Sequence, residues 1–239
     1  MIFFGLLDTY LMIYILAAIV PAIVLLVMVY RKDKVEPEPL GLILALIGFG
    51  ILAALVSIIL ETIAQKLLPV FIKPDNPYYT IFFAFLAVAV IEEGTKFFFL
   101  YKRTWRDWNF NYSFDGIVYA VSVSLGFAAF ENVGYVFNYG LTVAPTRAVL
   151  AIPGHMSFAI FMGLFYGKAK NAYDRGNSGL TVFFNILAYI TAVFCHGVYD
   201  SCAMIGTDES QAIFLVFVVV MFIIAFTTIQ VESKRDHRV

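Results

Sequence analysis

Long apolar stretches recur along this 239-residue chain, separated by short polar segments. A helix that crosses a bilayer needs about 20 mostly apolar residues. Hydrophobic residues make up 62% of the sequence and charged residues only 14%, whereas soluble domains average about 25% charged residues. The sequence therefore predicts an all-α, polytopic transmembrane bundle of about seven helices. The expected spans are residues 9–30, 40–60, 79–100, 114–138, 148–167, 180–203 and 212–229.

No linker in the sequence is long enough to separate domains, so residues 1–239 are expected to form a single integral membrane domain. The N-terminal stretch lacks both a basic region and a small-residue cleavage site, which predicts a retained helix instead of a signal peptide. Cys195 and Cys202 lie in one apolar stretch, where a disulfide between them is not expected.

Basic residues alternate between the segments that connect the spans. Going from the N-terminus to the tail, these segments contain 0, 3, 2, 3, 1, 3, 0 and 3 lysines and arginines. The positive-inside rule then places the N-terminus outside and the C-terminus in the cytosol. The lipid bilayer and a membrane-anchored protein substrate are the expected partners, and no nucleic acid is expected. The formal net charge of −1 by itself says nothing about nucleic acid.

Ionisable and amide side chains interrupt four of the predicted spans. A charge at the bilayer centre costs roughly 2.5–3.5 kcal/mol on insertion scales, so such groups are expected to face the bundle interior and meet polar partners. They are Glu92, Glu93 and Lys96 in the third span, Glu131 and Asn132 in the fourth, His155 in the fifth, and His196 and Asp200 in the sixth. Their approximate depths predict one shared cavity, nearer the outer half of the bilayer.

Residue spacing predicts which of these groups meet on a helix face. Lys96 follows the two glutamates by three and four residues and can reach either of them, while Asp200 follows His196 by four and can orient its ring. Pro153 removes a backbone hydrogen bond beside His155, which predicts a helix break that lines a cavity.

Small residues predict where helices approach closely. Gly126 lies in the fourth span, and Gly163 and Gly167 lie in the fifth. Glycine lets helix backbones come near each other in a membrane. We therefore expect tight helix crossings at these positions.

A cavity with these side chains is suited to activating water. A glutamate in an apolar site can act as a general base near neutral pH, and a histidine can donate to a developing oxyanion or to a leaving amine. Two histidines and a glutamate, here His155, His196 and Glu92 or Glu93, can also hold a catalytic zinc ion. The H-E-x-x-H pattern of soluble zinc proteases is absent, so the sequence leaves metal dependence open.

Four short motifs, in this order, resemble the PrsW family of intramembrane proteases, which is distantly related to the CAAX prenyl endopeptidase and bacteriocin-immunity superfamily. The motifs are Glu92-Glu93-Gly94-Thr95-Lys96, Phe127-Ala128-Ala129-Phe130-Glu131-Asn132, His155 and His196-Gly197-Val198-Tyr199-Asp200. The resemblance implies an endopeptidase of the bacterial plasma membrane with a catalytic core at about residues 79–203. It also implies that the enzyme makes the first (site-1) cut in a membrane-anchored anti-sigma factor during a stress response.

By this resemblance Glu92, Glu93, His155 and His196 are the catalytic candidates. Lys96, Glu131, Asn132 and Asp200 are the supporting ones. The wider superfamily often has histidine at the position of Glu131 and asparagine at that of Asp200. This leaves open whether these two residues act directly in the site or only support other groups.

Other interpretations of the polar residues remain. The Glu–Lys and His–Asp pairs also suit interhelical polar clamps that only stabilise a bundle. Intramembrane glutamate, histidine and aspartate are likewise used by proton-coupled transporters and channels, although no internal repeat supports that alternative. A non-catalytic, peptide-binding membrane protein of the immunity type is the third alternative.

Overall fold

The computed structural model describes residues 2–239, and the side chains of residues 10–239. Almost all of this part of the chain is helical, and it contains no strand beyond one isolated bridge between Tyr112 and Arg238. The long helices are α1 (Ile2–Tyr30), α2 (Leu40–Phe71), α4 (Val90–Thr104), α5 (Asp115–Tyr139), α7 (Ile152–Asp174), α8 (Ser178–Ile205) and α9 (Asp208–Glu232). The short ones are α3 (Tyr79–Phe82), η1 (Phe83–Ala89), η2 (Leu141–Val143), α6 (Ala144–Thr146) and η3 (Arg147–Ala151). The predicted all-α fold is confirmed.

Within the described residues, six helical stretches are long and apolar enough to cross a membrane. The third predicted span is not one of them, although α3, η1 and α4 follow one another without a break from Tyr79 to Thr104. It carries Glu92, Glu93 and Lys96, and this concentration of charge lowers its hydropathy. The stretch that departs most from membrane composition is therefore the one that carries the paired glutamates.

The predicted boundaries of two spans need correction. The second span was expected to end at residue 60, but α2 continues to Phe71 and so includes Glu61 and Gln65. An apolar run ends at its first charged residue, whereas a helix continues while its backbone bonds are satisfied and part of its surface stays apolar. The fifth span starts earlier than residue 148, because η2, α6 and η3 lead into α7.

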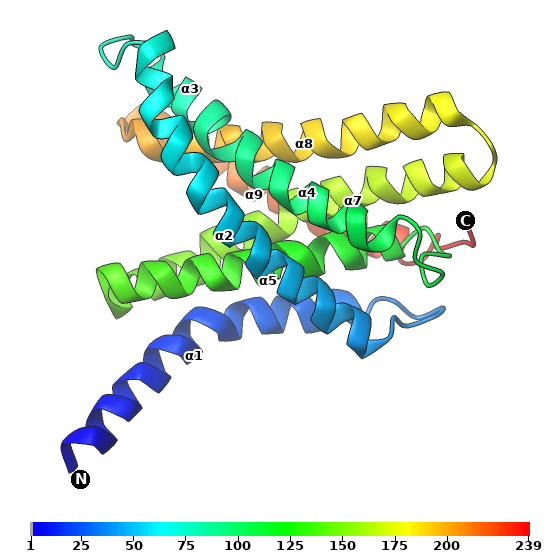
Figure 1. Cartoon of the computed structure of the whole chain (residues 1–239), viewed down its shortest axis with the longest axis horizontal. Coiled ribbons are helices and arrows are strands. Elements are labelled where there is room, and N and C mark those ends of the chain that lie inside the picture. Colours follow the sequence, from blue (N-terminus) through cyan, green and yellow to red (C-terminus); the bar gives the residue numbers. More distant parts are fainter. Residues whose placement is uncertain (1) are drawn as a thin grey trace.

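Figure 1 shows α5 in the middle of the bundle, with α1 on one side and α2 crossing it on another. Most of the side chains of α5 and α7 are buried. Cys195 and Cys202 are free thiols, as expected.

The segments rich in basic residues gather at one end of the bundle, near the C-terminus in Figure 1. Asn111 donates to the Glu36 carboxylate at 3.3 Å, and Asn171 lies 2.9 Å from His237 in the tail. The tail itself pairs with the segment before α5, through Ser113 N to His237 O at 3.0 Å and Val239 N to Asn111 O at 2.8 Å. This arrangement agrees with alternating spans, and the outside position of the N-terminus stays a prediction.

Glycines allow the close crossings that the sequence predicts. A Cβ atom on Gly163 or Gly167 of α7 would lie within 3 Å of the backbone of α5 or of Ser113 just before it. A Cβ atom on Gly126 of α5 would collide in the same way with the backbone of Ile47 in α2. These crossings fix α5 against both α2 and α7, which carry residues of the polar site.

Two π-helical segments precede the site residues. η1 ends three residues before Glu92, and η3 ends four residues before His155. Pro153 is the second residue of α7, but η3 runs directly into α7, so its missing N–H removes one backbone donor inside a continuous helical stretch. The predicted break is therefore present, but on the N-terminal side of Pro153. Such π segments widen a helix locally and are frequent at functional sites.

The crossing of α2 and α5 can be tested with one methyl group. Gly126→Ala should lower the melting temperature of the purified protein, because overpacking a tight contact costs about 1–3 kcal/mol. Gly134→Ala in the same helix is the matched control, since its Cβ would meet no atom within 4 Å. Equal melting temperatures for the two variants would contradict the close packing described here.

Candidate active site

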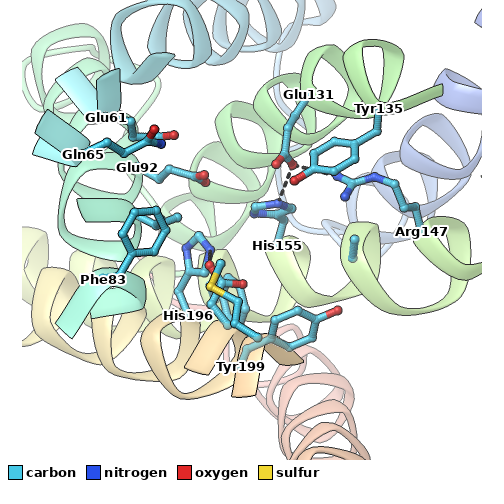
Figure 2. A pocket seen from close by; sticks show the side chains of 15 residues that line it. Glu61, Gln65, Phe83, Glu92, Glu131, Tyr135, Arg147, His155, His196 and Tyr199 are labelled. Carbon is cyan, nitrogen blue, oxygen red and sulfur yellow. Dashed lines mark hydrogen bonds and ion pairs between the residues drawn. The ribbon is translucent and has the colours of Figure 1, made fainter. Parts of the chain in front are cut away.

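The polar residues of four helical stretches meet around one cavity of about 240 Å³ (Figure 2). Glu92 comes from α4, Glu131 from α5, His155 from α7, and His196 and Asp200 from α8. The cavity lies toward the end of the bundle opposite the tail, because Tyr135, Arg147 and Met204 near the α5–α6 and α8–α9 connections also line it. By the predicted orientation this is the outer half, as the sequence suggested.

Lys96 lies at the centre of the site and is almost completely buried. Its Nζ donates to Glu93 Oε1 at 2.8 Å, to Glu92 Oε2 at 3.1 Å and to His155 Nδ1 at 3.2 Å. The same ammonium lies 3.9 Å from the centre of the Phe127 ring. The predicted contact between Lys96 and the glutamates is confirmed, and it involves both of them together.

His155 is held between a donor and an acceptor. A lysine ammonium has only donors, so the Nδ1 atom of His155 accepts and its Nε2 carries the proton. This Nε2 lies 3.1 Å from Glu131 Oε2. The two contacts therefore fix the orientation of the ring, with Nδ1 toward Lys96 and Nε2 toward Glu131.

His196 lies between two carboxylates. Its Nδ1 is 2.9 Å from Glu93 Oε1, and its Nε2 is 3.3 Å from Asp200 Oδ2. The ring also stacks on Phe158 with a centroid separation of 4.8 Å. The predicted pairing of Asp200 with His196 is confirmed, and Glu93 adds a second carboxylate from another helix.

Glu131 and Asn132 share one arginine. Arg147 donates to Glu131 Oε2 at 2.9 Å and to Asn132 Oδ1 at 2.7 Å, and its guanidinium lies over the Tyr135 ring. Asn132 also donates to the backbone carbonyl of Ala18 in α1. Both residues thus hold neighbouring groups in place, and Glu131 in turn contacts His155.

The two adjacent glutamates occupy different positions. Glu92 lines the cavity, whereas Glu93 is fully buried between Lys96 and His196. One oxygen of Glu93, Oε2, has no hydrogen-bond partner among the described residues. The separation of about 100° between adjacent helical residues produces this difference.

Besides several apolar residues, sequence reasoning missed four polar residues that line the cavity: Glu61, Gln65, Tyr135 and Arg147. Glu61 and Gln65 lie beyond the predicted end of their span, and Figure 2 shows both side chains opposite Glu131 across the cavity. Arg147 was counted only as the single basic residue of its connecting segment. A single basic residue that follows a span containing a glutamate was the sequence signal that could have predicted the ion pair between Arg147 and Glu131.

The donor set has the composition of a metal site. Each of Glu92, Glu93, His155 and His196 offers one ligand atom, and the four atoms lie within 4.8 Å of one another. Two imidazoles with carboxylate are a catalytic zinc set. Glu131 and Asp200 contact the far nitrogens of the rings, as the carboxylates that orient metal-binding histidines do. The residues therefore fit a metal ion, which would take the place of the Lys96 ammonium between these donors.

Comparison with known proteins identifies the chain. Residues 38–227 match the model of the PrsW family intramembrane metalloprotease. A protein named Protease PrsW from Oceanobacillus iheyensis is 35% identical over 210 residues, covering 87% of this chain and 91% of the relative. Its counterpart in Geobacillus kaustophilus is 34% identical over 186 residues, covering 77% and 76%. The one in Clostridioides difficile is 32% identical over 211 residues, covering 87% and 86%. No solved structure matches.

These matches decide between the alternatives that the sequence left open. They identify a peptidase, and not a transporter or a non-catalytic immunity protein. Together with six apolar helices in the described residues, the bacterial relatives identify a multi-pass protein of the bacterial cell membrane. The chain belongs to the PrsW family of intramembrane metalloproteases.

Proposed function

We propose that the protein hydrolyses a peptide bond of a membrane-anchored substrate in the cavity lined by Glu92, His155 and His196. The observation that carries this proposal is the convergence of these side chains, from three different helices, on one cavity inside the bundle. Their burial excludes bulk water, which strengthens every electrostatic interaction with a developing charge. The cavity of about 240 Å³ has room for the scissile peptide unit and a water molecule.

Glu92 is the proposed general base. It lines the cavity and keeps one contact, to Lys96 at 3.1 Å. A water molecule between Glu92 and the scissile carbonyl carbon would give its proton to the carboxylate as it attacks. Glu93 is proposed to act through its neighbours instead, because it holds both Lys96 and His196 and does not face the cavity.

The histidines are proposed to serve the oxygen and nitrogen of the scissile bond. Both rings line the cavity, with their centroids 5.4 Å apart. Both nitrogens of His196 now pair with carboxylates, Glu93 and Asp200. In a metal-free mechanism His196 would exchange one of these partners for the oxyanion or the leaving amine, whereas in the metal-bound enzyme it would serve as a ligand instead. Glu131 keeps the tautomer of His155 fixed, since it accepts from Nε2 and leaves Nδ1 as an acceptor or a ligand.

Zinc is the proposed metal, held by His155, His196 and a glutamate of the pair. When bound, it would polarise the carbonyl and lower the pKa of water. For this to happen, Lys96 has to leave the centre of the donor set. After moving out of the centre, the Lys96 side chain could still pair with one of the two glutamates, both of which it contacts now.

An apolar groove next to the cavity is the proposed entry for the substrate. It has a volume of about 510 Å³, and Tyr135, Arg147, Tyr199 and Asp200 line both spaces. Its other walls come from η3, the end of α8 and the start of α9, with Leu150, Ala203, Phe214 and Leu215 among the lining residues. A transmembrane segment needs apolar contacts, and the shared residues connect this groove directly to the catalytic groups.

The proposed substrate is a membrane-anchored anti-sigma factor, cut first at this site. The motif resemblance supports this substrate, and the position of the cavity supports a cut in the half of the membrane opposite the basic segments. The groove and the cavity together suit a substrate whose helix ends near that surface.

The catalytic roles can be tested by single substitutions. Glu92→Gln and His155→Ala should each lower the cleavage rate of a membrane-anchored substrate in proteoliposomes by at least about 100-fold, the usual contribution of acid–base groups. Glu209→Gln, a carboxylate exposed at the start of α9, is the matched control and should keep full activity. Full activity of Glu92→Gln in correctly inserted protein would reject Glu92 as the base.

Metal dependence can be tested on the purified protein. A strong chelator should abolish cleavage and zinc should restore it, because the donor set fits zinc. Activity that survives chelation, in protein that contains no metal by elemental analysis, would refute a metal-assisted mechanism.

The variant Asp200→Asn tests whether Asp200 supports zinc binding through His196. Loss of a carboxylate that orients a metal-binding histidine typically costs 10–100-fold in metal affinity or activity, so this variant should need roughly that much more zinc for half-maximal activity. A merely structural role of Asp200 would leave the zinc dependence unchanged.

The groove can be tested by filling it. Ala203→Trp should raise the KM for a membrane-anchored substrate several-fold, because the indole would occupy the groove without contacting the catalytic groups. Ala212→Trp is the control, since Ala212 is exposed on α9 but does not line the groove. An unchanged KM for Ala203→Trp would argue that the substrate enters elsewhere.

A further inference from the structure

A second buried polar cluster lies at the opposite end of the bundle from the proposed active site. Asp33 and Glu38 belong to the segment between α1 and α2, and Asp115 is the first residue of α5. Their exposed fractions are 4%, 3% and 0%. One carboxylate oxygen of each residue lies within 4.8 Å of the others.

No lysine, arginine or histidine forms an ion pair with these carboxylates within the described part of the chain, where all ion pairs lie elsewhere. Among the described residues, several of the buried oxygens also have no partner of hydrogen-bond geometry, although Glu38 lies close to Asp115. These oxygens are Asp33 Oδ1 and Oδ2, Glu38 Oε2 and Asp115 Oδ1. The other oxygen of Asp115 accepts from the backbone of Asn111 and Tyr112, at 3.0 and 2.7 Å.

Tyr119 adds an independent sign of a missing ligand. It follows Asp115 by four residues and so shares its helix face, and its phenol group faces Glu38 and Asp115. The side chain is completely buried, and its hydroxyl approaches the Glu38 carboxylate, but among the described residues it does not reach the geometry of a hydrogen bond. A buried phenol almost always has a partner.

Asp236 in the tail extends the negative charge of the cluster. Its Oδ1 accepts from Ser113 Oγ at 3.0 Å and from Phe114 N at 2.9 Å. Its Oδ2 is buried without a partner, and its charge raises the pKa of Asp33. Four carboxylates from three parts of the chain thus gather without a counter-charge.

Burial disfavours the charged forms of the two carboxylates in the segment between α1 and α2. Burial, together with nearby carboxylates, raises the pKa of Glu38 to about 7 and that of Asp33 to about 6. Charged carboxylates that are buried together without a cation destabilise a fold. A bound cation would remove that penalty, and the geometry of the oxygens suits one.

We propose that Asp33, Glu38 and Asp115 bind one hard divalent cation, Mg²⁺ or Ca²⁺, with Tyr119 and Asp236 beside it. Calcium binds oxygen ligands at 2.3–2.6 Å and magnesium at 2.0–2.1 Å, so two ligands on opposite sides of one ion lie about 4–5 Å apart. The oxygens here lie within 4.8 Å of one another. The set has no nitrogen or sulfur donor, which distinguishes it from the catalytic donors that suit zinc.

The cation would fix the segment between α1 and α2 to the start of α5. Because α5 carries Glu131 and packs tightly on α2 and α7, the ion would stabilise the helices that position the proposed catalytic groups. The ion itself would contact none of those groups. The tail would be included through Asp236.

Thermal stability and ion binding test the proposal on the full-length protein in detergent. After chelation and dialysis, Mg²⁺ or Ca²⁺ at a hundredfold excess over its Kd should raise the melting temperature by roughly 5–10 °C. Equilibrium dialysis of the wild type should find one such ion per chain. The two salts are tested separately, and the one with the larger shift identifies the ion.

Matched variants locate the effect. Glu38→Gln should abolish the cation-dependent shift, whereas Glu36→Gln, exposed in the same segment, and His155→Ala in the catalytic cavity should keep it. An equal shift in Glu38→Gln and Glu36→Gln would overturn the proposal. So would a wild type that binds neither ion at millimolar concentration, a result that does not depend on whether any variant folds.

Discussion

The buried ammonium of Lys96 is the interaction on which the catalytic half of the bundle depends. It donates hydrogen bonds to both Glu92 and Glu93, although its single positive charge balances only one of the two carboxylates, and it contacts Nδ1 of His155. A buried charge costs several kcal/mol unless partners compensate it. Three polar partners and the Phe127 ring provide this compensation, so the carboxylates can stay at membrane depth.

The helices around this lysine pack closely and hold the charged groups near one another. Glycine contacts bring α5 against α2 and α7, and π-helical segments precede Glu92 and His155. Around the two histidines, Glu131 and Asp200 then fix ring orientation, as hydrogen-bonded carboxylates do at metal sites. Packing therefore determines the geometry, while the carboxylates determine the protonation and direction of the rings.

Buried carboxylates lie at both ends of the bundle, and their negative charge is compensated in different ways. Beside the proposed catalytic cavity, the buried ammonium of Lys96 supplies an internal cation. The acidic cluster of Asp33, Glu38 and Asp115 has no basic partner among the described residues, and its short connecting segment leaves little freedom to separate the charges. An external cation is the natural complement of such a cluster, and it would act on stability without entering the reaction.

The sequence by itself determined the helical membrane class, the order of the spans and many of the polar residues that meet at the proposed active site. The period of a helix and the cost of a charge in lipid are local properties, so spacing alone paired Lys96 with the glutamates and Asp200 with His196. Only the tertiary structure decided that Glu92 faces the cavity while Glu93 lies behind it, and that Glu61 and Arg147 join the site. These facts depend on how helices rotate and cross, and crossing is set by contacts between residues far apart in the chain.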